Sequence, residues 1–190
     1  MNFVLDASVT MTWLLGDSKP ADRAYAQGAL EALKHADRHA EVPVTWALEV
    51  SNVIARAEAK GLLAEAQSKA FLEMLSNAPI LTDGATFTQA LGSTLDLARR
   101  YRLSAYDASY LELALRAGLP LATLDADLAK AARKAGVKRA TLSETSDPVV
   151  PDRVAAYNQS SEPSPARIHV RDASVEPATD DWPFLYLHTR

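Results

Sequence analysis

Short apolar runs that each end on an acid, with helical patterns between them, constrain the fold of this chain most strongly. The run 3–5 (FVL) ends at Asp6, and the run 119–124 (LPLATL) ends at Asp125. Both runs have the length and apolar character of buried strands, and a helical pattern follows each of them. Because strands that alternate with helices form parallel sheets, the sequence predicts an α/β fold.

The remaining elements are predicted from periodicity and from glycine and proline positions. Further strands are predicted at 41–44 and 79–81, the latter buried, and a last edge strand at 137–142. Helices are predicted at 7–15, within 17–40, and at 46–60, 64–77, 86–101, 104–117 and 126–135.

The composition changes sharply near Ser143. Residues 1–142 carry equal numbers of acids and bases, so the net charge of -4 belongs to residues 143–190, which also hold six of the 10 prolines. We expect 1–142 to form one domain and 143–190 to be a Pro-rich acidic C-terminal extension, extended or disordered. Its apolar segment 182–187 is either a docking element or part of a non-native extension.

Several classes of protein are excluded by composition. No apolar run approaches the roughly 18 residues of a membrane span, and MNFVLDAS lacks the basic start of a signal peptide. The absence of cysteine excludes disulfides and thiolate metal sites and fits a cytoplasmic protein. With residues 1–142 neutral, binding to nucleic acid would need a local basic patch.

Four carboxylates occupy positions that a surface acid does not explain well. Asp6 and Asp125 follow strands, and the carboxyl ends of parallel strands meet where ligands bind. Glu49 lies on or beside the apolar stripe of its helix, and Asp107 shares a face with Leu111. Four negative charges directed at one crevice repel one another unless protons or cations neutralise them.

Each acid also has a structural alternative. Asp6 and Asp125 could cap helices, a role that contributes about 1 kcal/mol. Asp107 fits a capping box with Ser104, and Glu49 could point to solvent from the edge of its stripe. These alternatives weaken when the four acids are considered together. Oxygen ligands without cysteine suit Mg²⁺ or Mn²⁺, and such a site serves phosphodiester hydrolysis.

Four segments in order match a known family. The segments VLDAS at 4–8, PVTWALEVSNVI at 43–54, LSAYDASYLELA at 103–114 and LATLDADL at 121–128 resemble PIN-domain ribonucleases. They are most similar to the VapC-type toxins of prokaryotic toxin–antitoxin systems. The resemblance covers residues 1–142 and implies a three-layer fold, with a parallel sheet flanked by helices. The irregular C-terminal tail, 143–190, does not resemble the usual end of this family.

The resemblance also implies an active site. Its acidic catalytic and metal-binding residues are Asp6, Glu49, Asp107 and Asp125, with Asp127 as a supplementary ligand. Beside them, Ser8 would orient a carboxylate or a water, unless it is a solvent-facing serine. The implied activity is that of an endoribonuclease that uses one or two Mg²⁺ (or Mn²⁺) ions to hydrolyse RNA. The implied partners are a cognate antitoxin and a second copy of the chain in a homodimer.

Two basic clusters flank the predicted acids. They comprise Arg99, Arg100 and Arg102 on one side, and Lys130, Arg133, Lys134, Lys138 and Arg139 on the other. Either cluster could contact RNA phosphates, and the alternative is favourable charge near helix C-termini. Tyr106 and Tyr110 would stack on bases or, as an i, i+4 pair, pack in the core.

Two other functions remain open. A catalytically silent PIN-like module would bind a metal or a partner through the same acids without turnover. An acid-cluster phosphatase is the third class, but position 8 is serine where a haloacid-dehalogenase-type enzyme places its second aspartate.

Overall fold

The computed structural model describes residues 1–16 and 18–142. The expectations for the extension 143–190, including its segment 182–187, lie outside the described residues. In residues 1–16 and 18–142, no helix is long and apolar enough to cross a lipid bilayer.

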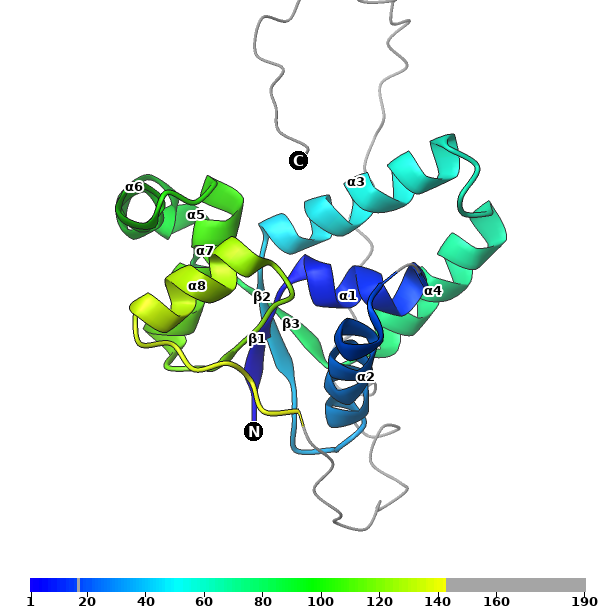
Figure 1. The fold of residues 1–190 in the computed structure, drawn as a ribbon, viewed down its shortest axis with the longest axis horizontal. Coiled ribbons are helices and arrows are strands. Elements are labelled where there is room, and N and C mark those ends of the chain that lie inside the picture. Colours follow the sequence, from blue (N-terminus) through cyan, green and yellow to red (C-terminus); the bar gives the residue numbers. More distant parts are fainter. Residues whose placement is uncertain (17, 143–190) are drawn as a thin grey trace, which may run out of the picture. The chain divides into compact units, whose positions relative to one another are not determined.

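A four-stranded parallel sheet forms the centre of the domain (Figure 1). Its strands are β1 (Phe3–Leu5), β2 (Ala40–Pro43), β3 (Ile80–Asp83) and β4 (Leu121–Ala122), in the order β3-β2-β1-β4. Residue Val4 pairs with Glu41 on one side and with Leu121 on the other. The parallel α/β fold predicted from sequence is therefore confirmed.

Helices connect the strands and cover both faces of the sheet. They are α1 (Ala7–Leu14), α2 (Pro20–Leu33), α3 (Thr45–Ala59), α4 (Glu65–Asn77), α5 (Thr86–Gln89), the π-helical turn η1 (Ala90–Thr94), α6 (Leu95–Tyr101), α7 (Ala105–Ala117) and α8 (Ala126–Lys134). Figure 1 shows α7 and α8 on one side of β1, with α1 and α2 on the other.

Alternation along β1 divides the core between the two faces. Phe3 and Leu5 pack with α2, whereas Val4 packs with Leu111 of α7 and Leu128 of α8. Successive side chains of a strand point to opposite faces, so three apolar residues anchor two helical layers. Full burial of each such side chain stabilises the fold by roughly 2 kcal/mol. A third cluster joins α1 to α3 and α4.

Three local predictions were wrong in detail. The segment 79–81 was predicted to be buried, but β3 is the edge strand and Leu81 is 45% exposed. The predicted strand 137–142 makes only one bridge, between Leu121 and Arg139, because β4 is too short to support a ladder. The helix predicted over 86–101 is interrupted at Gly92, which leaves the helical region (φ -112°, ψ -106°), a conformation open to a residue without Cβ.

Candidate active site

The candidate site lies where the order of the strands reverses. Chain order runs from β1 to β2 in one direction, while β4 pairs with β1 on the opposite side. In open parallel sheets, ligands bind at such a switch point, outside the carboxyl ends of the strands. Asp6 directly follows β1, and Thr123 and Asp125 follow β4, so this topology places them at the same edge.

Asp6 is the most buried of the predicted acids, with 4% exposure. Its Oδ2 accepts hydrogen bonds from the hydroxyls of Ser8 and Thr123, the latter at 2.6 Å. These hydroxyls themselves accept backbone N–H groups, from Leu124 at 3.0 Å and from Asp125 at 3.0 Å. Asp6 begins α1, but its side chain makes no capping hydrogen bond. Its carboxylate is thus held by the loop after β4 and does not cap the helix.

Glu49 lies half-buried in α3, with its Oε2 accepting a 2.5 Å hydrogen bond from the hydroxyl of Tyr110. Tyr110 belongs to α7, and a second contact joins α7 to α3, because the hydroxyls of Ser109 and Thr45 are 3.0 Å apart. Trp46 donates from Nε1 to the Thr10 hydroxyl at 3.1 Å, which ties α3 to α1. Glu49 is therefore fixed against both neighbouring helices.

Asp107 and Asp125 sit at the starts of α7 and α8. The Ser104 hydroxyl accepts a hydrogen bond from the Asp107 N–H and donates one of 2.7 Å to Asp107 Oδ2. The capping interaction predicted from the sequence is therefore present. Asp125 is exposed and its Oδ1 accepts the N–H of Leu128 at 2.7 Å. Asp127 is also exposed, two residues into α8. The hydrogen bond to the Leu128 N–H uses only Oδ1 of Asp125, so the other oxygen is available to bind a cation.

The acids affect one another through their charges. Burial raises the pKa of Asp6, hydrogen bonds from Ser8 and Thr123 oppose this, and the charges of Asp107 and Asp125 raise it further. Burial also raises the pKa of Asp107, to which the charges of Asp125 and Asp127 contribute. These couplings place the acids in one electrostatic region.

Glu49 belongs to the same region. Burial, followed by the charges of Asp6 and Asp107, raises the pKa of Glu49 to about 7, against the effect of the Tyr110 hydrogen bond. Burial and the charges of Asp6 and Glu49 raise the pKa of Tyr110, so its hydroxyl remains protonated and can donate.

A contrasting acid lies at the end of β3. Although partial burial opposes the effect, hydrogen bonds from the Ala85 N–H, Thr86 and Arg116 lower the pKa of Asp83. Arg116 forms a 2.7 Å salt bridge with it. In residues 1–16 and 18–142, no lysine, arginine or histidine forms a salt bridge with any of the four predicted site acids. Their negative charge is not neutralised by side chains of this part of the chain.

The donor set suits a hard divalent cation. Three of the acids keep one oxygen that receives no hydrogen bond from a described residue, namely Asp6 Oδ1, Glu49 Oε1 and Asp125 Oδ2. The Asp107 carboxylate is hydrogen-bonded by Ser104. Carboxylate oxygens are the ligands that Mg²⁺ and Mn²⁺ prefer. The residues thus fit such a cation in chemistry and in available lone pairs.

The positions of the four acidic side chains are less favourable for holding a metal ion than their chemistry is. In the described part of the chain, no three carboxylate, histidine or cysteine side chains lie close enough to enclose a metal ion. The side chains are turned toward their own partners, as with Glu49 and Tyr110. Binding one cation through three of these acids would require side-chain rotation.

The basic residues differ in their surroundings. Arg99 lies 3.6 Å from Asp96, Arg100 lies over the Tyr101 ring, and Arg102 ends α6 in a left-handed conformation. On α8, Lys130, Arg133 and Lys134 are exposed, and only Arg133 of these three lines a pocket.

Two residues beside the acids were not foreseen as site residues. Thr123 was within the quoted segment LATLDADL, and a buried hydroxyl before a strand-end acid was its signal. Tyr110 was expected either to stack on bases or to pack in the core. It is fully buried, as the packing alternative predicted, and it also holds Glu49. Its spacing of three residues from Asp107, on one helix face, was the available signal.

Comparison with known proteins agrees with this fold. The family profile described as "PIN domain" matches residues 3–134. The crystal structure of PAE2754 from Pyrobaculum aerophilum is similar in fold, with a TM-score of 0.50 and 22% identity, covering 69% of this chain and 79% of that one. The search of curated proteins finds no match. PIN domains are generally nucleases that use divalent metals, and the profile match covers most of this chain: it belongs to the PIN-domain family.

Proposed function

We propose that this protein is a Mg²⁺- or Mn²⁺-dependent endoribonuclease that hydrolyses phosphodiester bonds of RNA. The observation that carries the proposal is that Asp6 and Asp125 lie at the strand switch point, with Glu49 and Asp107 on adjacent helices, and that none of the four pairs with a described cation. Membership of the PIN family indicates a nuclease in general, and these acids supply the chemistry that such an enzyme needs.

The residues then divide into three roles. Asp6, Glu49, Asp107 and Asp125 would hold the cation, with Asp127 as a supplementary ligand. A bound divalent cation lowers the pKa of water and stabilises the charge that develops at phosphorus. Ser8 and Thr123 orient the Asp6 carboxylate through their hydrogen bonds. Glu49, whose Oε2 is held by Tyr110, is the acid proposed to accept a proton from the attacking water.

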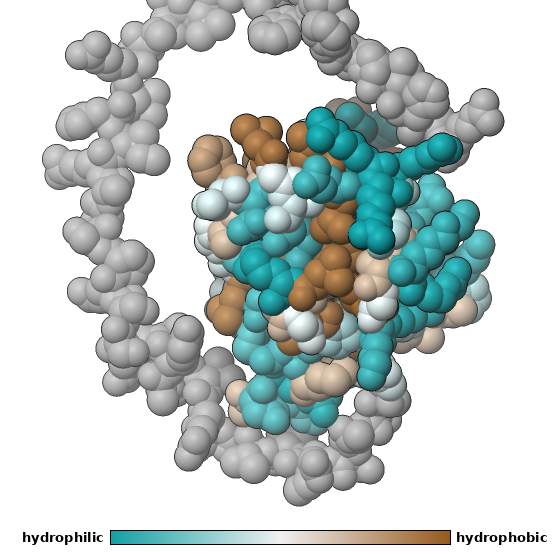
Figure 2. Space-filling view, turned by 90° about the vertical axis from the view of Figure 1, so that its left-hand side faces the viewer, coloured by the Kyte–Doolittle hydropathy of each residue, from teal (hydrophilic) through white to brown (hydrophobic). Residues whose placement is uncertain are grey.

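We further propose that the protein is the toxin of a type II toxin–antitoxin pair, acting in the cytoplasm as a homodimer and inhibited by a cognate antitoxin. Exposed apolar side chains support a protein partner, and they include Leu48, Leu62, Leu72, Phe87 and Leu91. Figure 2 shows apolar side chains at the surface of the face on the α6 and α8 side of Figure 1. Apolar surface of this kind favours association with another chain.

The decisive experiment is cleavage of a structured RNA pool by the full chain with Mn²⁺ or with EDTA, beside Asp6→Asn. We expect cleavage that needs the metal and falls at least about a hundredfold in the variant. Asp96→Asn, which changes an exposed acid outside the site, is the matched control and should cleave like the wild type. Metal-independent cleavage, or full activity of Asp6→Asn, would contradict the proposal.

A catalytically silent PIN-like module is the second candidate, and one observation favours it. No three potential ligands among the described residues are close enough to hold a metal ion. If the folded protein leaves the RNA pool intact when Mn²⁺ is present, this second function replaces the first.

A further inference from the structure

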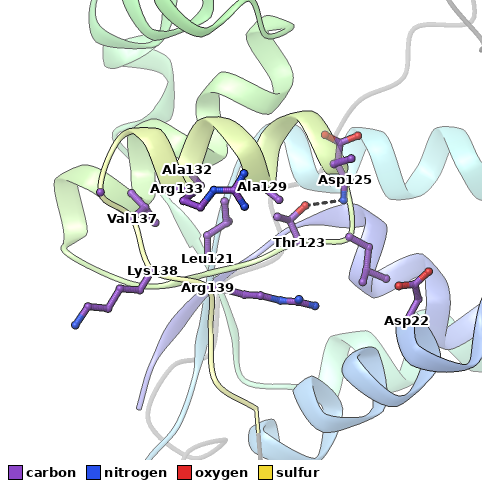
Figure 3. Close-up of a pocket in the computed structure, with 13 residues that line it drawn as sticks. Asp22, Leu121, Thr123, Asp125, Ala129, Ala132, Arg133, Val137, Lys138 and Arg139 are labelled. Atoms are coloured by element: carbon purple, nitrogen blue, oxygen red, sulfur yellow. Dashed lines mark hydrogen bonds between the residues drawn. The ribbon is translucent and has the colours of Figure 1, made fainter.

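A pocket of about 590 Å³ lies beside the acids, on the far side of β4. It is formed by the loop after β4, by α8 and by residues 136–139, with Asp22 of α2 also in its lining. Figure 3 shows the Arg133 and Arg139 side chains extending toward the end where Asp125 and Asp22 lie, whereas Lys138 points the other way. The volume is within the range of small-molecule sites, about 300–1,000 Å³.

Three cations line this pocket, and their positive charge is only partly matched. Arg133 and Lys138 form no salt bridge with any residue of the ranges 1–16 and 18–142. Arg139 stacks over the ring of Tyr25, with its guanidinium carbon 3.9 Å from the centroid. Tyr25 is itself held by a 3.1 Å hydrogen bond to the carbonyl of Ala140. Arg139 is thus positioned in advance, which reduces the entropy lost when it binds an anion.

Apart from Asp22, Thr123 and Asp125, the rest of the lining is apolar or glycine. Leu121 and Val137 are buried beneath the pocket, Leu124 borders it, and Ala129 and Ala132 present a small-residue face of α8. An apolar surface next to guanidinium groups suits a ligand with a flat hydrophobic part and an anionic part. A nucleotide has both, because its base can lie on apolar surface while its phosphate pairs with arginine.

The pocket shares two residues with the candidate site. Thr123 and Asp125 line it, and the same Thr123 hydroxyl donates to Asp6 Oδ2 at 2.6 Å. Asp125 is exposed and borders both the group of acids and the pocket, so an RNA bound at Asp125 has its neighbouring nucleotide next to the pocket. Asp22, at the opposite wall, offers an acceptor for a ribose hydroxyl or a base amino group.

We propose that this pocket binds one unpaired nucleotide of single-stranded RNA next to the bond that is cleaved, with its phosphate on Arg133 and Arg139 and its base on the apolar floor. The proposal rests on the proposed function, because it names the path of the substrate through that site. It also selects between the two basic clusters. Arg99 and Arg100 contact Asp96 and Tyr101 and do not line this pocket.

The test is binding of a fluorescein-labelled, unstructured RNA nonamer to the full chain in EDTA, measured by fluorescence anisotropy over a series of KCl concentrations. Arg133→Ala/Arg139→Ala should weaken binding by about tenfold and reduce the slope of log K against log salt by about 0.7, for the one phosphate that both arginines contact. Arg99→Ala/Arg100→Ala removes the same charge from the other cluster and should change binding by less than about twofold. Equal losses in the two double variants, or no loss in either, would overturn the proposal.

Two more variants separate insertion into the pocket from general charge attraction. Ala129→Phe fills the pocket without changing charge, and it should weaken binding severalfold while the salt slope stays the same. Arg133→Ala alone leaves the Arg139–Tyr25 stack intact. A loss of affinity in this single variant therefore cannot come from a folding defect caused by removal of the stack. Unchanged binding by folded Ala129→Phe, checked by circular dichroism, would rule out an inserted base.

Failure of this proposal can be told apart from failure of the proposed function. If the wild type cleaves RNA in an Mn²⁺- and Asp6-dependent way while the pocket variants bind and cleave normally, only the pocket assignment is wrong. If the wild type neither binds the nonamer nor cleaves RNA, both are wrong.

Discussion

The hydroxyl of Tyr110 donates a 2.5 Å hydrogen bond to Oε2 of Glu49, and this contact joins α7 to α3 at the candidate site. Tyr110 is fully buried, so the bond is shielded from water. Such a bond to a carboxylate favours its charged form, in opposition to the burial that raises the pKa of Glu49 to about 7.

Removal of this hydroxyl should therefore raise the pKa of Glu49. In Tyr110→Phe, we expect the Glu49 carboxyl to titrate above about 7, because burial and the charges of Asp6 and Asp107 remain. The measurement is a ¹³C NMR titration of the glutamate carboxyl groups in EDTA, with the Glu49 signal identified from Glu49→Gln. Tyr106→Phe, at an exposed tyrosine on the same helix, should leave the titration unchanged. A lower Glu49 pKa in Tyr110→Phe would contradict this account of the bond.

Stability without metal should fall as the pH rises. The folded state raises the pKa of Asp6, Glu49 and Asp107, so it binds protons more tightly than the unfolded chain. For Glu49 the stabilising effect is complete below its ordinary value of 4.5 and is lost as the pH passes through about 7. In EDTA, the urea midpoint should decrease between these values.

The matched variant for this pH effect is Glu49→Gln, which should flatten the dependence over the same interval. Mn²⁺ should raise the midpoint most at high pH, because a ligand that binds only the folded state stabilises it. A urea midpoint that rises with pH in EDTA would show that these acids are not destabilised by burial.

The salt bridge at the end of β3 should have a structural role. Arg116 bonds Glu112, which is 5% exposed, at 2.8 Å, and Asp83 at 2.7 Å. Arg116→Ala leaves the Glu112 carboxylate buried without its partner, and it should lower the free energy of unfolding by about 2 kcal/mol. Arg99→Ala breaks an exposed pair and should cost less than about 1 kcal/mol. Equal losses in urea denaturation of the two variants would refute the distinction.

Gly28 allows the segment after α8 to approach α2. A Cβ added at Gly28 would lie 2.5 Å from the carbonyl oxygen of Leu142, a backbone atom that cannot simply rotate away. Gly28→Ala should therefore destabilise the protein by about 1 kcal/mol, even though alanine is the better helix former. Gly84→Ala, where nothing lies within 4 Å, serves as the control. A higher melting temperature of Gly28→Ala than of the wild type would exclude the close approach.

Much of the fold follows from local patterns. The apolar run that becomes β1 and the capping pair of Ser104 and Asp107 were recognisable because strands and helix starts depend on neighbouring residues. The prediction for 79–81 was wrong in burial because the place of a strand in a sheet depends on its neighbours in space. Gly92 alone did not reveal the interruption of its helix, since isolated glycines are tolerated within helices.

Local sequence patterns were enough to predict the main strands and helices, their order along the chain, and the acids that follow the strands. Which side chains are in contact depends on the tertiary structure. Thr123 reaches Asp6 across 117 positions of sequence and Tyr110 reaches Glu49 across 61. The fold also places Arg116 in a salt bridge with Asp83, whereas the four candidate acids form no salt bridge with a described residue. The physical reason is that periodicity and capping act over a few residues, whereas pairing, burial and charge coupling depend on distances that only the folded chain creates.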